Sequence, residues 1–253
     1  MASIDLNCDL GESFGVWRLG DDVGMLGVVT SANVACGFHA GDPSTLRAVC
    51  TAAVAAHVSI GAQVGYPDLA GFGRRYLAID PDELRDAVLY QLGALDAFAQ
   101  VAGTEVAYVK PHGALYHATI DDPGQAGAVV AAATEYDPSM AVLGAPGSEL
   151  LRLAEAAGLE PVPEAFADRA YGDDGRLVPR SEAAALLLDA EEVAAQAVRL
   201  ATEQCVRTST GDTIRVDARS ICLHGDTPGA VTLARAVRAA LEGAGVGIHP
   251  FTV

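Results

Sequence analysis

Lysine is almost absent from this sequence. Among 253 residues and 16 basic side chains there is a single lysine, Lys110, and every other basic residue is an arginine. Arginine carries a planar, permanently charged guanidinium group, whereas lysine carries a compact ammonium whose pKa can fall when it is desolvated. The single lysine therefore indicates chemistry at position 110 that a guanidinium cannot do. The alternative is chance survival in an arginine-biased composition.

Several common catalytic motifs are missing as well. The sequence contains no G-x-x-x-x-G-K-[ST] loop, no G-x-S-x-G turn and no H-E-x-x-H helix. It therefore does not predict a P-loop ATPase or the hydrolases that carry the other two motifs. The segment Gly144-Ala145-Pro146-Gly147-Ser148 opens a predicted helix and could hold an anion through its N–H groups, but this signal is weak on its own.

Composition narrows the choice of partners and compartment. The net charge of -17, from 33 acidic and 16 basic residues, argues against nucleic acid and against anionic membrane surfaces. No basic segment followed by an apolar run opens the chain, and the longest uncharged stretch, 48–67, is broken by polar residues, glycine and proline. We expect no signal peptide and no membrane span. Five cysteines without a C-x-x-C pair suggest reduced thiols in a cytoplasmic protein.

One pattern repeats along the chain: a short apolar run, then glycine and polar residues, then an amphipathic Ala/Leu-rich stretch. Seven strands alternating with six helices predict a parallel sheet in a single α/β domain over residues 1–253. Residues 206–218 alternate around Gly211-Asp212 and predict an inserted β-hairpin. The predicted strands are Ser3–Cys8, Ser31–Cys36, Val58–Ala62, Glu105–Val109, Met140–Leu143, Glu160–Ala165 and Ser220–Leu223. The predicted helices are Pro43–Ala56, Pro81–Ala102, Pro123–Tyr136, Gly147–Ala157, Ala190–Glu203 and Pro228–Glu242.

Nearly every predicted strand runs into a cluster of polar residues. In parallel α/β folds the active site collects at the carboxyl ends of the strands. Period-two alternation places three pairs on shared faces, and we expect the Lys110 ammonium to emerge at the mouth of the fold. We also expect the carboxylate of Asp226 to orient the His224 imidazole. The three pairs are Asn7 with Asp9, Lys110 with His112, and His224 with Asp226.

Three histidines follow three different strands and lie near carboxylates: His39, His112 and His224. We expect at least two of them to line one site, since independent core positions explain this placement poorly. Such a site suits general acid/base hydrolysis of an amide or a related bond, with or without a metal. Simpler roles stay open for the neighbours: Asp42 and Asp226 precede helices and could be caps. The Arg74-Arg75 pair could be an anion clamp or only solvated charge.

Six motifs, in order along the chain, resemble the LamB/YcsF family, the A subunit of prokaryotic ATP-dependent 5-oxoprolinase. One departure is His117, where the family commonly has Asn, and we leave it out of the site. The resemblance runs from about residue 4 to residue 245. The motifs are Asn7-x-Asp9-Leu10-Gly11-Glu12, Ala32-Asn33-x-Ala35-Cys36-Gly37-x-His39-Ala40-Gly41-Asp42, Gly65-Tyr66-Pro67-Asp68, Lys110-Pro111-His112-Gly113-Ala114-Leu115-Tyr116, Glu164-x-Phe166-Ala167-Asp168-Arg169-x-Tyr171 and Cys222-Leu223-His224-Gly225-Asp226.

The resemblance implies a (β/α)7 TIM-like barrel of the glycoside hydrolase/deacetylase type. It also implies cleavage of 5-oxo-L-proline to L-glutamate, coupled to ATP through partner subunits B and C. We expect a catalytic group of Asp9, Lys110, His112, Asp168, His224 and Asp226. We expect a substrate-binding group of Asn7, Glu12, Asn33, His39, Gln63 and Arg169.

Two other functions stay open. One is a metal-dependent, deacetylase-like hydrolase that acts alone, with Asp9, His39 and His112 as candidate ligands. The other is a subunit that only binds the lactam. The sequence leaves open whether a metal is bound and which histidine is the general base.

Overall fold

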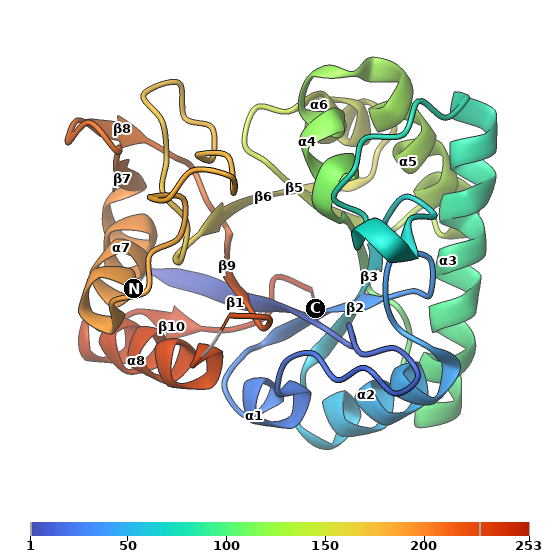
Figure 1. Cartoon of the computed structure of the whole chain (residues 1–253), viewed down its shortest axis with the longest axis horizontal. Coiled ribbons are helices and arrows are strands. Elements are labelled where there is room, and N and C mark those ends of the chain that lie inside the picture. Colours follow the sequence, from blue (N-terminus) through green and yellow to red (C-terminus); the bar gives the residue numbers. More distant parts are fainter. Residues whose placement is uncertain (1, 228, 253) are drawn as a thin grey trace.

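Seven parallel strands close into a barrel (Figure 1). The computed structural model describes residues 2–227 and 229–252. Strand β1 pairs with both β2 and β9, which closes the ring, and the predicted (β/α)7 barrel is confirmed. The barrel strands are β1 (Ser3–Leu10), β2 (Ser31–Ala35), β3 (Ser59–Val64), β4 (Tyr108–Pro111), β5 (Ala141–Gly144), β6 (Glu160–Phe166) and β9 (Ser220–His224).

Six helices surround this ring close to their predicted positions. Three of them begin at an Asp-Pro pair, where the carboxylates of Asp42, Asp80 and Asp122 accept hydrogen bonds from backbone N–H groups of the first turn. The expected helix start at Pro228 lies outside the described residues. The helices are α2 (Pro43–Ala55), α3 (Pro81–Ala102), α5 (Pro123–Tyr136), α6 (Glu149–Ala156), α7 (Ala190–Glu203) and α8 (Ala230–Gly243).

Four further elements do not follow from the sequence pattern, because each is short or weakly amphipathic. Three of them are α1 (Asp22–Leu26), the 3-10 turn η1 (Leu69–Gly71) and β10 (Gly247–Ile248), which pairs with the start of β1. The fourth is α4 (Gly113–Asp121), which begins directly after β4 without a side-chain cap. The predicted hairpin is confirmed as two antiparallel strands, β7 (Cys205–Arg207) and β8 (Thr213–Arg215).

The barrel interior is unusually polar at its centre. Leu6 and Leu10 of β1 belong to the main apolar core, while Asp5, Asn7 and Asp9 bond to side chains of other barrel strands. Barrel interiors are more commonly filled by branched aliphatic side chains. These alternating polar positions carry the chemistry described below.

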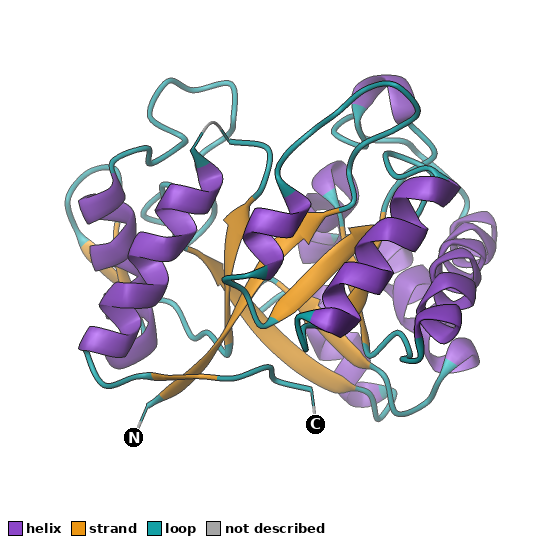
Figure 2. Cartoon of the chain, turned by 90° about the horizontal axis from the view of Figure 1, so that it is seen from below, coloured by secondary structure: helices purple, strands orange, loops and turns teal. Residues whose placement is uncertain are grey.

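The amino end of the barrel is closed by apolar side chains. Tyr108, Ala141, Leu143 and Val162 form a small cluster, on which Phe251 packs from the C-terminal segment. Both ends of the chain lie on this side, opposite the long loops (Figure 2). In the described residues no helix is long and apolar enough to cross a membrane.

Candidate active site

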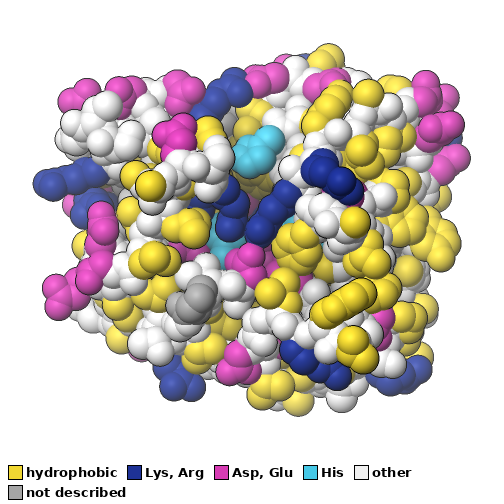
Figure 3. Space-filling view, viewed as in Figure 1, with side chains coloured by type: hydrophobic (Ala, Val, Ile, Leu, Met, Phe, Trp, Pro, Cys, Tyr) yellow, Lys and Arg dark blue, Asp and Glu magenta, His cyan; other side chains and the backbone are white. Residues whose placement is uncertain are grey.

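A cavity of about 610 Å³ opens at the carboxyl ends of the barrel strands. Figure 3 shows basic and histidine side chains gathered around the hollow of this face. The polar clusters after β1, β4, β6 and β9 all reach it, as the strand pattern predicted. Its walls include Asp9, Arg74, Lys110, His112, Tyr116, His117, Phe166, Arg169, Arg180 and His224.

Lys110 lies in the floor of this cavity and is only 2% exposed. Its Nζ donates to Glu164 Oε1 at 2.6 Å and to Asp9 Oδ1 at 3.3 Å. Asn7 Oδ1 at 3.4 Å and the Cys222 sulfur at 3.3 Å complete the surroundings. The ammonium is thus held by groups from β1, β6 and β9.

One expectation about this lysine needs correction. Strand β4 runs to Pro111, two residues beyond its predicted end, so the ammonium lies inside the barrel and not at its mouth. Burial acts to lower the pKa of Lys110, but Asp9 and Glu164 outweigh it and hold the pKa well above its usual value. Lys110 is therefore a fixed positive charge, and it keeps the pKa of Asp9 below its usual value despite the burial that acts to raise it.

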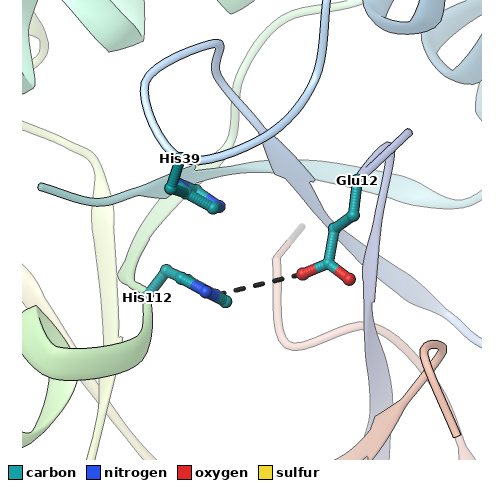
Figure 4. A group of neighbouring side chains, drawn as sticks. All are labelled: Glu12, His39 and His112. Carbon is teal, nitrogen blue, oxygen red and sulfur yellow. Dashed lines mark ion pairs between the residues drawn. The ribbon is translucent and has the colours of Figure 1, made fainter. Parts of the chain in front are cut away.

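His112 faces two carboxylates. Its Nε2 lies 3.0 Å from the carbonyl oxygen of Phe72, which can only accept, so Nε2 carries the proton and Nδ1 is the basic nitrogen. That Nδ1 is 4.0 Å from Asp9 Oδ2. It is also 4.0 Å from Glu12 Oε1, the pair marked in Figure 4. Each separation is too long for a direct hydrogen bond. Burial holds the pKa of His112 well below its usual value, so the ring is neutral at pH 7.

Glu12 binds its proton more tightly than an ordinary glutamate does. Burial, assisted by the charge of Asp9, raises the pKa of Glu12 well above its usual value. Glu12, the basic Nδ1 of His112 and the ionised Asp9 form a small network of neighbouring titratable groups, in which a proton can move between carboxylate and imidazole.

His39 stacks on His112, with ring centroids 4.1 Å apart and an interplanar angle of 7°. Its Nε2 lies 3.0 Å from Gln63 Oε1, and burial lowers its pKa to about 4. Among the described residues, the group that could surround a metal ion is Glu12, His39 and His112, with Glu12 where we expected Asp9. A metal binds imidazole in the ring plane, and two stacked, nearly parallel rings share no such point, so this arrangement does not fit a metal.

The third histidine forms a dyad with a carboxylate. His224 Nδ1 lies 3.0 Å from both oxygens of Asp168, and the backbone N–H of His224 donates to Asp168 Oδ2 at 2.8 Å. Burial acts to raise the pKa of Asp168, but His224 outweighs it and the pKa is lowered. Since Nδ1 donates to the carboxylate, Nε2 is the nitrogen available to a molecule in the cavity.

Asp226 does not orient His224, contrary to the expectation from their spacing. It pairs with Arg74 at 2.7 Å, at the edge of the site. The reason is that β9 ends at His224, so the alternation that would place both side chains on one face stops there. A residue from a different strand end, Asp168, takes the expected position.

The remaining expected residues support the floor or the wall. Asn33 donates to Asn7 Oδ1 at 2.7 Å and to Asp9 Oδ1 at 2.9 Å, which aims both at Lys110. Gln63 Nε2 lies 3.4 Å from Glu12 Oε1. Arg169 lines the cavity while donating to two backbone carbonyls of the loop that follows it.

Two residues of this site were missed from the sequence. Glu164 bonds Lys110 through Oε1, and the Tyr116 ring packs on Phe166 in the cavity wall. Among the described residues, Glu164 Oε2 and the Tyr116 hydroxyl are buried without a hydrogen-bond partner. Unpaired buried polar atoms are costly, so they mark a place for a bound molecule or water. The position of Glu164 near the end of a predicted strand was the available signal.

Known proteins resemble this chain along its whole length. The LamB/YcsF family model matches residues 4–253. A Streptomyces avermitilis protein, named as the A subunit of 5-oxoprolinase, is 58% identical over 98% of this chain and 99% of its own length. A protein of the same name from Mycolicibacterium gilvum is 54% identical over the full length of both chains.

A solved structure extends the likeness to three dimensions. A lactam utilization protein from Thermus thermophilus superposes with a TM-score of 0.93 at 43% identity, over 98% of this chain and 100% of that one. The full-length family match and the identities above 50% agree with the motif positions and the barrel. The chain belongs to the LamB/YcsF family.

Proposed function

We propose that this chain, as a single-domain cytoplasmic subunit, opens the lactam ring of 5-oxo-L-proline to give L-glutamate, with ATP used through partner subunits B and C. The observation that carries the proposal is the buried group of Lys110, Asp9 and His112 at the base of the cavity. It offers a fixed positive charge, an ionised carboxylate and a neutral base at one place. The relatives are named as one subunit of a 5-oxoprolinase, which supports both the reaction and the existence of partners.

The proposed division of labour explains why ATP would be used elsewhere. A lactam amide is stabilised by resonance, which makes it a poor electrophile. A partner that transfers a phosphoryl group to the lactam oxygen removes that resonance. Water then adds to the ring carbon, the C–N bond breaks as nitrogen gains a proton, and a second water releases phosphate from the acyl phosphate.

Each basic residue has a role in this scheme. Neutral His112 takes the proton of the attacking water, with Glu12 and Asp9 as its neighbours. His224, held by Asp168, delivers a proton to the ring nitrogen. Lys110 keeps Asp9 ionised and provides positive charge near the developing oxyanion.

The test is reconstitution with the B and C subunits. The chain alone should not hydrolyse ATP, and the complex should release glutamate from 5-oxoproline at the expense of ATP. Full ATP-coupled activity from the isolated chain would contradict the partner model.

The same assay separates the two alternatives. A metal-dependent hydrolase acting alone would cleave amides without partners and lose activity with a chelator. A subunit that only binds the lactam would allow normal turnover by the complex after His112→Ala.

A further inference from the structure

The cavity has two unlike ends. Its floor carries Asp9, Lys110 and His112, whereas its outer wall carries further cationic and imidazole groups (Figure 3). This concentration of positive charge is notable in a chain of net charge -17. The groups of this outer wall are Arg74, His117, Arg169 and Arg180.

Arg169 is a buried guanidinium that forms no ion pair with the described residues. It is 3% exposed, and its Nε and one terminal nitrogen donate to the carbonyls of Ala185 at 3.1 Å and Val178 at 2.7 Å. Those carbonyls are neutral, and the carboxylate of Asp168 acts on Arg169 only from farther away, without an ion pair. Burial, and then the charge of Arg180, lower the pKa of Arg169 to about 10.

Arg180 brings a second charge to the same wall. The nearby arginines Arg74 and Arg176 pair with Asp226 and Asp121. In residues 2–227 and 229–252 neither Arg169 nor Arg180 has such a partner. Asp168 is the carboxylate that acts on both arginines, but it is bonded to His224. A further anion between Arg169 and Arg180 would relieve the repulsion of their like charges. His117, on α4, faces the same group, and its pKa is lowered by burial and then by Arg169 and Arg180.

We propose that Arg169 and Arg180, with His117 beside them, form a subsite for a carboxylate or phosphoryl group on the molecule whose amide is cleaved at the floor. Guanidinium groups bind both kinds of anion through paired N–H donors. The assignment to the reacting molecule rests on the proposed function, whereas anion binding itself does not. The subsite fixes which end of the substrate faces outward, and so aims the amide at His112 and His224.

The experiment measures anion binding to the isolated chain by calorimetry. Inorganic phosphate is the first probe, and 5-oxoproline and 2-pyrrolidinone, the same lactam without a carboxylate, are the second and third. Arg180→Gln should weaken binding of the anion at least tenfold. Arg176→Gln is the matched control, because Arg176 lies on the same loop but pairs with Asp121 and does not line the cavity. It should leave binding unchanged.

The probes also distinguish the two sources of the anion. If 5-oxoproline displaces phosphate and 2-pyrrolidinone does not, the subsite takes the carboxylate. If phosphate and 5-oxoproline bind together, and only phosphate is weakened by Arg180→Gln, it takes a phosphoryl group. No anion binding by the unaltered chain, or equal binding by Arg180→Gln, would overturn the subsite. Failure of the proposed function would appear separately, as no glutamate from the unaltered complex.

Discussion

At the scale of single residues, Lys110 is bound to its neighbours from several sides, and this sets what its replacement does. Lys110→Met keeps the volume but leaves Asp9 and Glu164 buried without a positive partner. Breaking a buried pair in this way costs about 3–5 kcal/mol. We expect a clear loss of melting temperature and of turnover. Restoring neutrality with Glu164→Gln in the same chain should recover part of the stability, and a double variant no more stable than Lys110→Met would contradict this account.

The two aspartates near His224 offer a matched comparison. Asp168→Asn removes the carboxylate that fixes the imidazole, and loss of such an orienting group lowers turnover by roughly 10²–10⁴-fold. Asp226→Asn removes only a partner of Arg74 at the edge of the site, so its loss should be at least about tenfold smaller. Steady-state turnover of the complex decides the matter, with thermal melting as the folding control. Equal losses of turnover in both variants would show that Asp226 also acts in the site.

His39 should make stability depend on pH. Its pKa is lowered to about 4 from an ordinary value near 6.5, so the unfolded chain binds the proton more readily. The contribution of neutral His39 to the free energy of unfolding is complete above pH 6.5. It is lost as the pH falls toward 4, and the loss is at most about 3 kcal/mol.

Other groups titrate in the same range, so the comparison must isolate His39. Raised pKa values at Glu12 and Asp5 act in the opposite direction. The quantity to measure is the difference in unfolding free energy between the unaltered chain and His39→Gln. It should fall as the pH is lowered from 7 to 4, and a constant difference would show that His39 takes up a proton without cost.

At the scale of elements, α7 holds the end of β6 in place. Gln196 Nε2 lies within hydrogen-bond distance of the carbonyl oxygens of Phe166, Ala167 and Arg169, at 3.0, 3.2 and 2.8 Å. Gln196→Leu leaves these buried acceptors unpaired, at a cost of about 1–3 kcal/mol or more. We expect a melting point lower by several degrees and reduced turnover, since Asp168 lies in this segment. Gln100→Leu, an exposed change on α3, should alter neither.

The elements also show where sequence reasoning succeeds and where it fails. Asp-Pro starts located α3 and α5 to the residue. Short pieces such as α1 and β10 lack such signals, because their place is set by contacts across the fold. The same holds in the site: the strand-end clusters indicated its members, but which carboxylate meets His224 depends on β6 and β9 lying side by side. The spacing of residues along the sequence does not show which strands become neighbours in the barrel.

At the scale of the whole molecule, the C-terminal segment closes the barrel end far from the cavity. Phe251 packs edge-on against Tyr108 with ring centroids 4.9 Å apart, and Tyr108 in turn donates to Asn33 at 2.7 Å. Phe251→Ala removes an aromatic contact worth about 0.5–1.5 kcal/mol beyond its buried area. The melting point should fall while the Michaelis constant for 5-oxoproline stays the same. A changed Michaelis constant would mean that Phe251 influences the site through Tyr108.

The composition and the shape of the barrel together define how this protein can be attached to a solid support. Its only lysine is 2% exposed and enclosed by acceptors, so coupling reagents that target lysine amines find no accessible lysine side chain. Introducing one by His249→Lys, at an exposed position beside the closed end, would create a single lysine handle. Molecules captured there would all present the open face of the barrel outward, toward any partner supplied in solution.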